Sequence, residues 1–178
     1  MYILGRIIML NIVLYEPEIP QNTGNIIRTC VATKATLHLI EPLGFRMNAQ
    51  SLKRSGVTYG DFANYIIYPN FDDFLEKNKG EFYFLTRYGL KTIYDMHVND
   101  PKINYYFILG KESTGIPLHI LKQNLNRCIR LPMAEEVRAL NVSNVAAIVL
   151  YEALRQQGFP NLSLFEPASL KGANHLLE

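Results

Sequence analysis

Short apolar segments alternate along this chain with segments in which apolar residues recur every three or four positions. The first kind predicts buried β-strands and the second amphipathic helices, and their alternation favours an α/β fold, a mainly parallel sheet flanked by helices. The expected strands are Ile7–Tyr15, Thr36–Ile40, Tyr65–Tyr68, Phe82–Thr86, Tyr105–Leu109 and Cys128–Leu131. The expected helices are Thr23–Thr33, Ala49–Ser55, Phe71–Lys77, Pro117–Asn124 and Val142–Gln157.

The last of these helices has an unusually wide apolar face. One stripe follows the i, i+3, i+4, i+7 spacing, and other apolar residues extend beyond it. The stripe is formed by Val142, Val145, Ala146, Val149 and Ala153, and the extension by Ile148, Leu150, Tyr151 and Leu154. Two explanations are open: the helix is packed deep inside the monomer, or one stripe contacts the sheet and the other a second subunit.

Length and composition are those of one ordinary domain. The chain has 178 residues, 48% of them hydrophobic and 19% charged, and it shows no repeat. We expect a single domain over residues 1–160, with residues 1–8 as a short N-terminal extension, and a C-terminal tail over residues 161–178. No apolar run reaches the ~20 residues of a membrane span, so no membrane partner is expected. Cys30 and Cys128 lie far apart and are expected to be reduced, buried thiols of a cytoplasmic protein.

Charge alone does not identify a partner. The formal net charge of +2 is compatible with nucleic-acid binding but does not require it, so any basic surface must be local. The four histidines show no metal-ligand spacing, and we expect packing or surface roles for them and no metal site. They are His38, His97, His119 and His175.

The segment over residues 16–28 joins the first expected strand to the first expected helix. Two prolines stop the strand, and Asn22 and Gly24 then favour caps and turns. Asn22, Asn25 and Arg28 therefore lie where a strand ends and a helix begins, which is the usual place for binding in an open α/β sheet.

A second strand end leads into residues 110–117. Gly110 would let a ligand approach the backbone without meeting a Cβ. Lys111 resembles part of a phosphate loop, but it is followed by Glu112 rather than Ser or Thr, which argues against nucleotide triphosphate hydrolysis. A carboxylate at this point would suit a ligand with positive charge, and the alternative is that Glu112 caps the turn around Ser113 and Gly115.

A third strand end leads from residues 129–131 through a polar loop to the last helix. Parallel strands present their carboxyl ends at the same edge of a sheet, so the three polar loops predict one composite pocket. The apolar side chains of Leu131, Met133 and Leu140 could grip a flat heterocycle.

These three segments resemble the motifs of a known family. The motifs are Asn22-Thr-Gly-Asn-Ile-Ile-Arg28, Gly110-x-Glu-x-x-Gly-Ile-Pro117, and Ile129-Arg-Leu-Pro-Met133 with Leu140-Asn-Val-Ser-Asn144. They are similar to those of the SPOUT-class RNA 2′-O-methyltransferases, and most similar to those of the small tRNA (cytidine/uridine-2′-O-)-methyltransferases that act at the wobble nucleotide, position 34. The resemblance covers nearly everything from Met9 to Phe159. It implies a C-terminal trefoil knot, a homodimer, S-adenosyl-L-methionine bound in the knot, and a tRNA substrate.

The resemblance also implies roles for single residues. Arg28 would be catalytic, and because a guanidinium stays protonated, we expect it to orient the ribose-phosphate and stabilise the developing alkoxide. Asn22 and Asn25 would shape the same pocket, and Ser143, Asn144 and Tyr151 would position the target nucleotide, with packing as the alternative for Tyr151. The cofactor would be bound by Leu85, Thr86, Gly110, Glu112, Gly115, Ile116, Ile129, Leu131, Met133, Ala139, Leu140 and Asn144.

For contact with tRNA we favour Lys53, Arg54 and Arg138, because phosphate contacts supply affinity without sequence choice. One departure concerns the cofactor: similar proteins usually read Ser-Arg-Ser where this chain reads Val137-Arg138-Ala139. The missing hydroxyl predicts a lower cofactor affinity or a backbone contact in its place. Two alternative functions are open, namely methylation of ribosomal RNA or another tRNA position, and an RNA-binding relative that has lost turnover.

Overall fold

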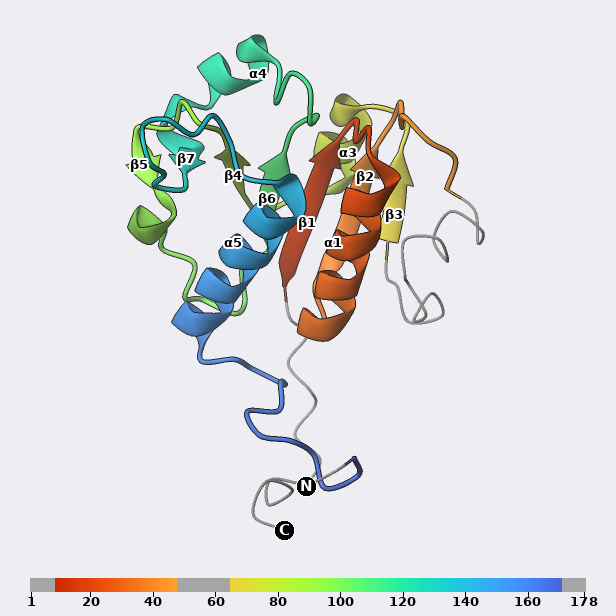
Figure 1. The fold of residues 1–178 in the computed structure, drawn as a ribbon, viewed down its shortest axis with the longest axis vertical. Coiled ribbons are helices and arrows are strands. Elements are labelled where there is room, and N and C mark those ends of the chain that lie inside the picture. The colour runs from red at the N-terminus through yellow and green to blue at the C-terminus, as the bar shows by residue number, and fades with distance from the viewer. Residues whose placement is uncertain (1–8, 48–64, 171–178) are drawn as a thin grey trace.

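The computed structural model describes residues 9–47 and 65–170, and its centre is a sheet whose paired strands all run parallel (Figure 1). Within this described part the sheet has seven strands in the order β3-β2-β1-β6-β4-β7-β5. Their bounds are β1 Leu10–Tyr15, β2 Thr36–Ile40, β3 Tyr65–Tyr68, β4 Glu81–Leu85, β5 Lys91–Thr92, β6 Tyr105–Leu109 and β7 Cys128–Arg130. The expected α/β class and mainly parallel sheet are confirmed.

The helices of the described part agree with the sequence pattern except at their ends. They are α1 Pro20–Thr33, α3 Phe71–Lys77, α4 Leu118–Gln123 and α5 Val142–Gln157, with 3₁₀ turns at Ile93–Asp95 and Leu125–Arg127. The expected start of α1 at Thr23 was wrong by one turn. Proline is well tolerated in the first turn of a helix, where its missing N–H would have no intrahelical partner. The helix expected over Ala49–Ser55 lies outside the described residues.

Two layers of helix cover the two faces of the sheet. Helices α1 and α5 pack side by side on one face, with α1 in front of β2 and α5 in front of β6 in Figure 1, while α3 and α4 contribute to the core on the other. Alternate residues of β1 serve the two cores: Ile12 and Leu14 belong to the first and Val13 to the second. A strand buried on both faces is apolar at nearly every position, and Asn11 is the polar exception in β1, with its side-chain amide hydrogen-bonded inside the protein.

The order of the strands fixes where loops converge. The chain runs outward from β1 to β2 and β3 and then resumes at β4 on the far side of β6, so the direction of winding reverses between β1 and β6. Open α/β sheets bind ligands at such a switch point, beyond the carboxyl ends of the strands. On the other flank, β7 lies between β4 and β5, which are consecutive in the chain. The trefoil knot itself stays a prediction.

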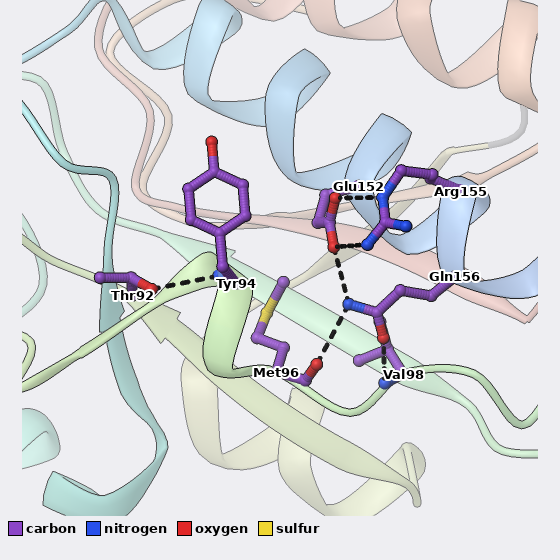
Figure 2. A network of polar contacts seen from close by, with 7 residues as sticks. All are labelled: Thr92, Tyr94, Met96, Val98, Glu152, Arg155 and Gln156. Atoms are coloured by element: carbon purple, nitrogen blue, oxygen red, sulfur yellow. Dashed lines mark hydrogen bonds and ion pairs between the residues drawn. The ribbon is translucent and has the colours of Figure 1, made fainter.

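The segment that follows β5 is fixed to α5 by side-chain hydrogen bonds (Figure 2). The amide of Gln156 donates to the carbonyl oxygen of Met96 at 3.1 Å and accepts from the backbone N–H of Val98 at 3.0 Å. Glu152 accepts from Gln156 at 2.8 Å and from the guanidinium of Arg155. The side chain of Gln156 thus satisfies a backbone donor and a backbone acceptor of the segment between β5 and β6. This segment is therefore held against the end of α5.

A buried polar network lies inside the second core. His38 contacts Asn11 through Nε2 at 3.1 Å and the hydroxyl of Tyr68 through Nδ1 at 2.9 Å. The amide nitrogen of Asn11 already donates to the carbonyl oxygens of Met9 and Tyr105, so its oxygen is the acceptor for an Nε2–H of His38. Burial lowers the pKa of the imidazole to about 4, so the ring is neutral at pH 7 and its Nδ1 accepts from the hydroxyl of Tyr68. This placement agrees with the packing role expected for His38.

Candidate active site

Four loops at the carboxyl edge of the sheet enclose a cavity of about 1020 Å³. They follow β1, β4, β6 and β7, and each contributes to the wall. The structure thus brings together the three segments that the sequence pattern placed at one edge, and it adds the loop after β4. The lining residues include Ile19 and Asn22, Thr86–Tyr88, Leu109–Leu118, and Arg138–Val142.

A smaller cavity of about 90 Å³ adjoins the large one. It shares Thr86, Arg87, Ala139 and Leu140 with the larger wall. Most of its lining is apolar: Leu85, Ile129, Leu131, Met133, Leu140 and Val145 all contribute. The three residues expected to grip a heterocycle, Leu131, Met133 and Leu140, therefore do lie around one narrow apolar space.

Glu112 anchors the loop after β6 to the start of α1. Its carboxylate accepts hydrogen bonds from the backbone N–H of Glu18 at 2.9 Å, from that of Ile19 at 3.4 Å, and from the side-chain amide of Asn22 at 2.9 Å. Ile19 is the N-cap of α1 and has no side chain able to cap it. A carboxylate is favourable at the positive end of a helix, so Glu112 supplies the missing cap from another loop. A capping role for Glu112 was one of the two sequence interpretations, but the group that it caps is the start of α1 and not the turn around Ser113 and Gly115.

The same two loops are also joined by contacts in which the carboxylates belong to the loop after β1 and their partners to the loop after β6. The carboxylate of Glu18 accepts from the hydroxyl and the backbone N–H of Ser113, each at 2.9 Å, and Lys111 forms an ion pair with Glu16 at 2.5 Å. The hydrogen bonds from Ser113, first the hydroxyl and then the N–H, hold the pKa of Glu18 below its usual value. These contacts are therefore complete at neutral pH.

Asn22 connects this pair of loops to the loop before α5. Its side-chain oxygen accepts from the amide of Asn141 at 3.0 Å. Asn141 is the N-cap of α5 and accepts from the N–H and the hydroxyl of Ser143, at 2.9 and 2.6 Å. A continuous series of hydrogen bonds thus runs from Ser143 through Asn141 and Asn22 to Glu112. Sequence reasoning missed Asn141 and Glu18, although asparagine directly before an apolar helix is a recognisable N-cap signal.

The glycines of these loops are required by close backbone approaches. A Cβ on Gly110 would lie 2.1 Å from the carbonyl carbon of Gly115, so the chain folds back on itself there. The expectation that Gly110 leaves space for a ligand was wrong, because its own loop occupies that space. Gly115 has a φ of +74°, which disfavours other residues. Gly89 packs in the same way against the backbone of Ile129, which holds the loop after β4 against β7.

Most of the expected cofactor residues line the two adjoining cavities. They are Leu85, Thr86, Gly110, Glu112, Gly115, Ile116, Ile129, Leu131, Met133, Ala139 and Leu140. Asn144 is not among the lining residues: it is exposed on α5, between Val142 and Val145, which do line the large cavity. Its expected contact with the cofactor stays a prediction.

The four expected catalytic residues lie outside the cavity walls. Asn25 and Arg28 are on the exposed side of α1, and Tyr151 is 49% exposed on α5. Ser143 is buried, and its hydroxyl is used at the N-terminus of α5, so capping accounts for it within one chain. The structure does not bring these residues into the pocket of their own chain, and their catalytic roles stay predictions.

Of the residues expected to contact RNA, Arg138 is exposed at the rim of the large cavity. Lys53 and Arg54 lie outside the described residues. Among residues 9–47 and 65–170, no group of three His, Cys, Asp or Glu side chains is placed to hold a metal ion. Within the same ranges, no helix has the length and apolar character needed to cross a membrane. Cys30 and Cys128 are both buried and unpaired, and burial raises the pKa of Cys30 to about 12.

A parallel α/β sheet with a composite pocket at its switch point defines a class of ligand-binding proteins. Within that class, the chain belongs to the SpoU rRNA Methylase family, whose sequence model matches residues 9–151.

Relatives and solved structures agree with this assignment. A protein from Geobacillus stearothermophilus, named provisionally as a tRNA (cytidine(34)-2′-O)-methyltransferase, is 50% identical over 86% of this chain and 99% of its own. The tRNA (cytidine(34)-2′-O)-methyltransferase of Saccharophagus degradans is 40% identical over 85% and 97%. A solved structure described under the heading "Structural insights into the 2-OH methylation of C/U34 on tRNA" is 34% identical, with a TM-score of 0.76 over 84% of this chain and 91% of that one.

Proposed function

We propose that this protein transfers a methyl group from S-adenosyl-L-methionine to the ribose 2′-hydroxyl of nucleotide 34, the wobble nucleotide, of tRNA. The observation that carries the proposal is the composite pocket, because every loop that resembles a family motif contributes to its wall. The names of relatives that are 40% to 50% identical over most of both chains support the position and the substrate. The protein would act in the cytoplasm, where its tRNA substrates are.

The residues of the pocket fit the proposed cofactor. The narrow apolar space between Leu131, Met133 and Leu140 suits a flat adenine ring. The large cavity beside it has a polar wall and room for the ribose and the methionine portion. When bound, S-adenosyl-L-methionine supplies a methyl group on a cationic sulphur, which is open to attack by an oxygen nucleophile. The fixed loops of the protein would orient this group and keep water from it.

Arg28 is the residue proposed to act on the reacting hydroxyl. The cation would orient the ribose-phosphate and stabilise the negative charge that grows on the 2′-oxygen as its proton leaves. The guanidinium cannot accept that proton because it stays protonated, so the proton passes to solvent water. Among the described residues, no carboxylate pairs with Arg28, so its positive charge is available for this role.

A homodimer is part of the same proposal. Helices α1 and α5 lie side by side (Figure 1), with Ile148 39% and Tyr151 49% exposed on α5 and with Asn25 and Arg28 exposed on α1. An exposed apolar side of a helix is stabilised when a second subunit covers it. Because Arg28 does not line the pocket of its own chain, a second subunit packed on this face would complete the tRNA site. Sedimentation of the wild type as a dimer, and of an Ile148→Glu variant as a monomer, would support this; a monomeric wild type would refute it.

The test of the function is the modification pattern of tRNA. Purified protein, labelled S-adenosyl-L-methionine and tRNA from a strain that lacks the corresponding gene are combined, and the product is digested and analysed by mass spectrometry. We expect a single new 2′-O-methyl group at position 34. Methylation of ribosomal RNA alone, which the family's description would favour, or methylation at another tRNA position would refute the proposal. Cofactor binding without any transfer would indicate a relative that only binds RNA.

A further inference from the structure

A third cavity, of about 310 Å³, adjoins the pocket on the side of the loops after β4 and β7. Three arginines line it, Arg87, Arg130 and Arg138, and Glu135 is the one carboxylate in its lining. The other lining residues are Tyr88, Met133, Ala134 and Val137. We call this space the arginine cleft. Three guanidinium groups and one carboxylate line it, so the cleft has a net positive charge and suits an anionic ligand.

The arginines of the cleft differ from those that serve the fold. Arg127 forms an ion pair with Glu81 at 2.7 Å, and Arg155 with Glu152 at 2.9 Å. In the part of the chain that the structure describes, neither a salt bridge nor a side-chain hydrogen bond engages Arg87, Arg130 or Arg138. Guanidinium groups that lack a protein partner are free to form bidentate contacts with phosphate.

An exposed aromatic ring lies next to these cations. Tyr88 is 66% exposed, and the guanidinium of Arg87 lies 5.3 Å from the centre of its ring. The loop that carries both residues is held against β7 by the close approach of Gly89 to Ile129. An exposed aromatic ring beside arginines that have no carboxylate partner among the described residues is the combination that binds single-stranded nucleic acid, in which bases stack and phosphates pair with cations.

The cleft and the large cavity share Arg87, Tyr88 and Arg138 in their walls. A polymer with a ribose in the large cavity would therefore continue directly into the cleft. A small anion would fill the cleft without using the exposed ring, so the position of Tyr88 favours an RNA strand.

We propose that the arginine cleft binds the sugar-phosphate backbone next to the methylated nucleotide, with an unpaired base stacked on Tyr88. This inference rests on the proposed function and adds Arg87, Arg130 and Tyr88 to the expected RNA contact of Arg138. The cleft would serve affinity for the anticodon loop rather than the transfer step.

The test compares Arg87→Gln, Tyr88→Ala and Tyr88→Phe with a matched control, Lys102→Gln. Lys102 is exposed and precedes β6, at the opposite edge of the sheet. Three quantities are measured for each full-length variant: S-adenosylhomocysteine affinity by calorimetry, binding of an anticodon stem-loop oligoribonucleotide at several salt concentrations, and kcat and KM for tRNA.

For Arg87→Gln we expect oligoribonucleotide affinity to fall about tenfold and the slope of log affinity against log salt to fall by about 1. Tyr88→Ala should weaken binding by about tenfold with an unchanged salt slope, and Tyr88→Phe should keep wild-type affinity, because stacking needs the ring and not the hydroxyl. In both weakened variants KM for tRNA should rise by a larger factor than S-adenosylhomocysteine affinity falls, because Arg87 also lines the apolar cavity and both residues line the large one. The control should match the wild type throughout.

Wild-type RNA affinity in Arg87→Gln and Tyr88→Ala would overturn the inference while leaving the proposed function intact. A loss of S-adenosylhomocysteine affinity in step with RNA affinity would also overturn it, because the arginines would then serve the cofactor. If the wild type transfers no methyl group, the proposed function fails, and the binding measurements still decide whether RNA occupies the cleft.

Discussion

Two networks of hydrogen-bonded side chains in this protein have different roles. The network around His38 lies inside the second core, and the polar groups of Asn11, His38 and Tyr68 are matched by partners within the protein. The network from Ser143 to Glu112 lies at the carboxyl edge, where it joins three loops around a cavity.

The comparison indicates that different parts of the fold determine stability and activity. The interior network has no group left to offer a ligand, so it can only contribute to the stability and uniqueness of the core. The edge network uses its hydrogen bonds to hold three loops in place, and among the described residues no salt bridge engages Arg87, Arg130 or Arg138 beside it. We therefore expect changes at the edge to alter activity more than stability, and changes in the interior to do the opposite.

The largest effect should come from Arg28, which is exposed on α1 and belongs to neither network. Arg28→Ala should reduce kcat by ~10²–10³, the range for loss of one group that stabilises a developing oxyanion. The midpoint of thermal unfolding should not change. Arg28→Lys should keep measurable turnover with a shallow pH dependence, because it keeps the charge. A lysine variant as inactive as the alanine variant would show that charge alone does not suffice and that the bidentate geometry is needed.

The interior network should make stability depend on pH. The pKa of His38 is about 4 in the folded protein and near its ordinary value of 6.5 when unfolded, so only the unfolded state binds a proton between these values. The stabilisation is complete above pH 6.5 and is lost as pH falls toward 4, by on the order of 3 kcal/mol. Urea unfolding of the wild type and of His38→Gln at pH 7 and pH 4 would measure it.

In that experiment the difference between wild type and variant should shrink at the lower pH. The exposed His97 provides the matched control, because His97→Gln should keep the wild-type pH profile. A wild-type profile in His38→Gln as well would show that other groups, such as the carboxylates of the loops, account for the whole pH dependence.

A mixed effect is expected at Asn22, which bridges Glu112 and Asn141. Asn22→Ala leaves an acceptor and a donor without partners and should lower the free energy of unfolding by ~1–3 kcal/mol. It should also weaken S-adenosylhomocysteine binding, because three loops of the pocket lose their common contact. Gln21→Ala, one residue earlier and exposed, is the control. Unchanged cofactor affinity in Asn22→Ala would show that the cofactor pocket does not depend on the hydrogen bonds of the edge network.

The smallest effect is expected at Ala139, which lines both the large and the apolar cavity. Ala139→Ser should leave activity similar or tighten cofactor binding, because a hydroxyl at this wall adds a donor without adding much volume. Isothermal titration with S-adenosylhomocysteine measures the change. A large loss of affinity would contradict the expected fit of the cofactor along this wall.

The sequence predicted most of the sheet and the convergence of its loops because both follow from local patterns. Apolar runs mark buried strands, and the carboxyl ends of parallel strands meet at one edge. Strand β5 was missed because two residues, Lys91 and Thr92, are too short for any alternation.

The remaining features of the site depend on contacts between residues far apart in the chain. The partners of Glu112 are 90 or more residues away, and the place of Arg87 and Tyr88 depends on the packing of Gly89 against Ile129. No local pattern encodes such contacts. The expectation for Gly110 failed for the same reason, because the group that fills its open side belongs to a turn formed only in the folded loop.

The most direct test of the account is a crystal structure of the protein with S-adenosylhomocysteine. We predict that its adenine will lie between Leu131, Met133 and Leu140 and that the rest will extend along the loops that begin at Thr86 and Gly110. A complex in which the compound binds elsewhere, or crystals in which these loops enclose nothing at saturating concentration, would contradict it.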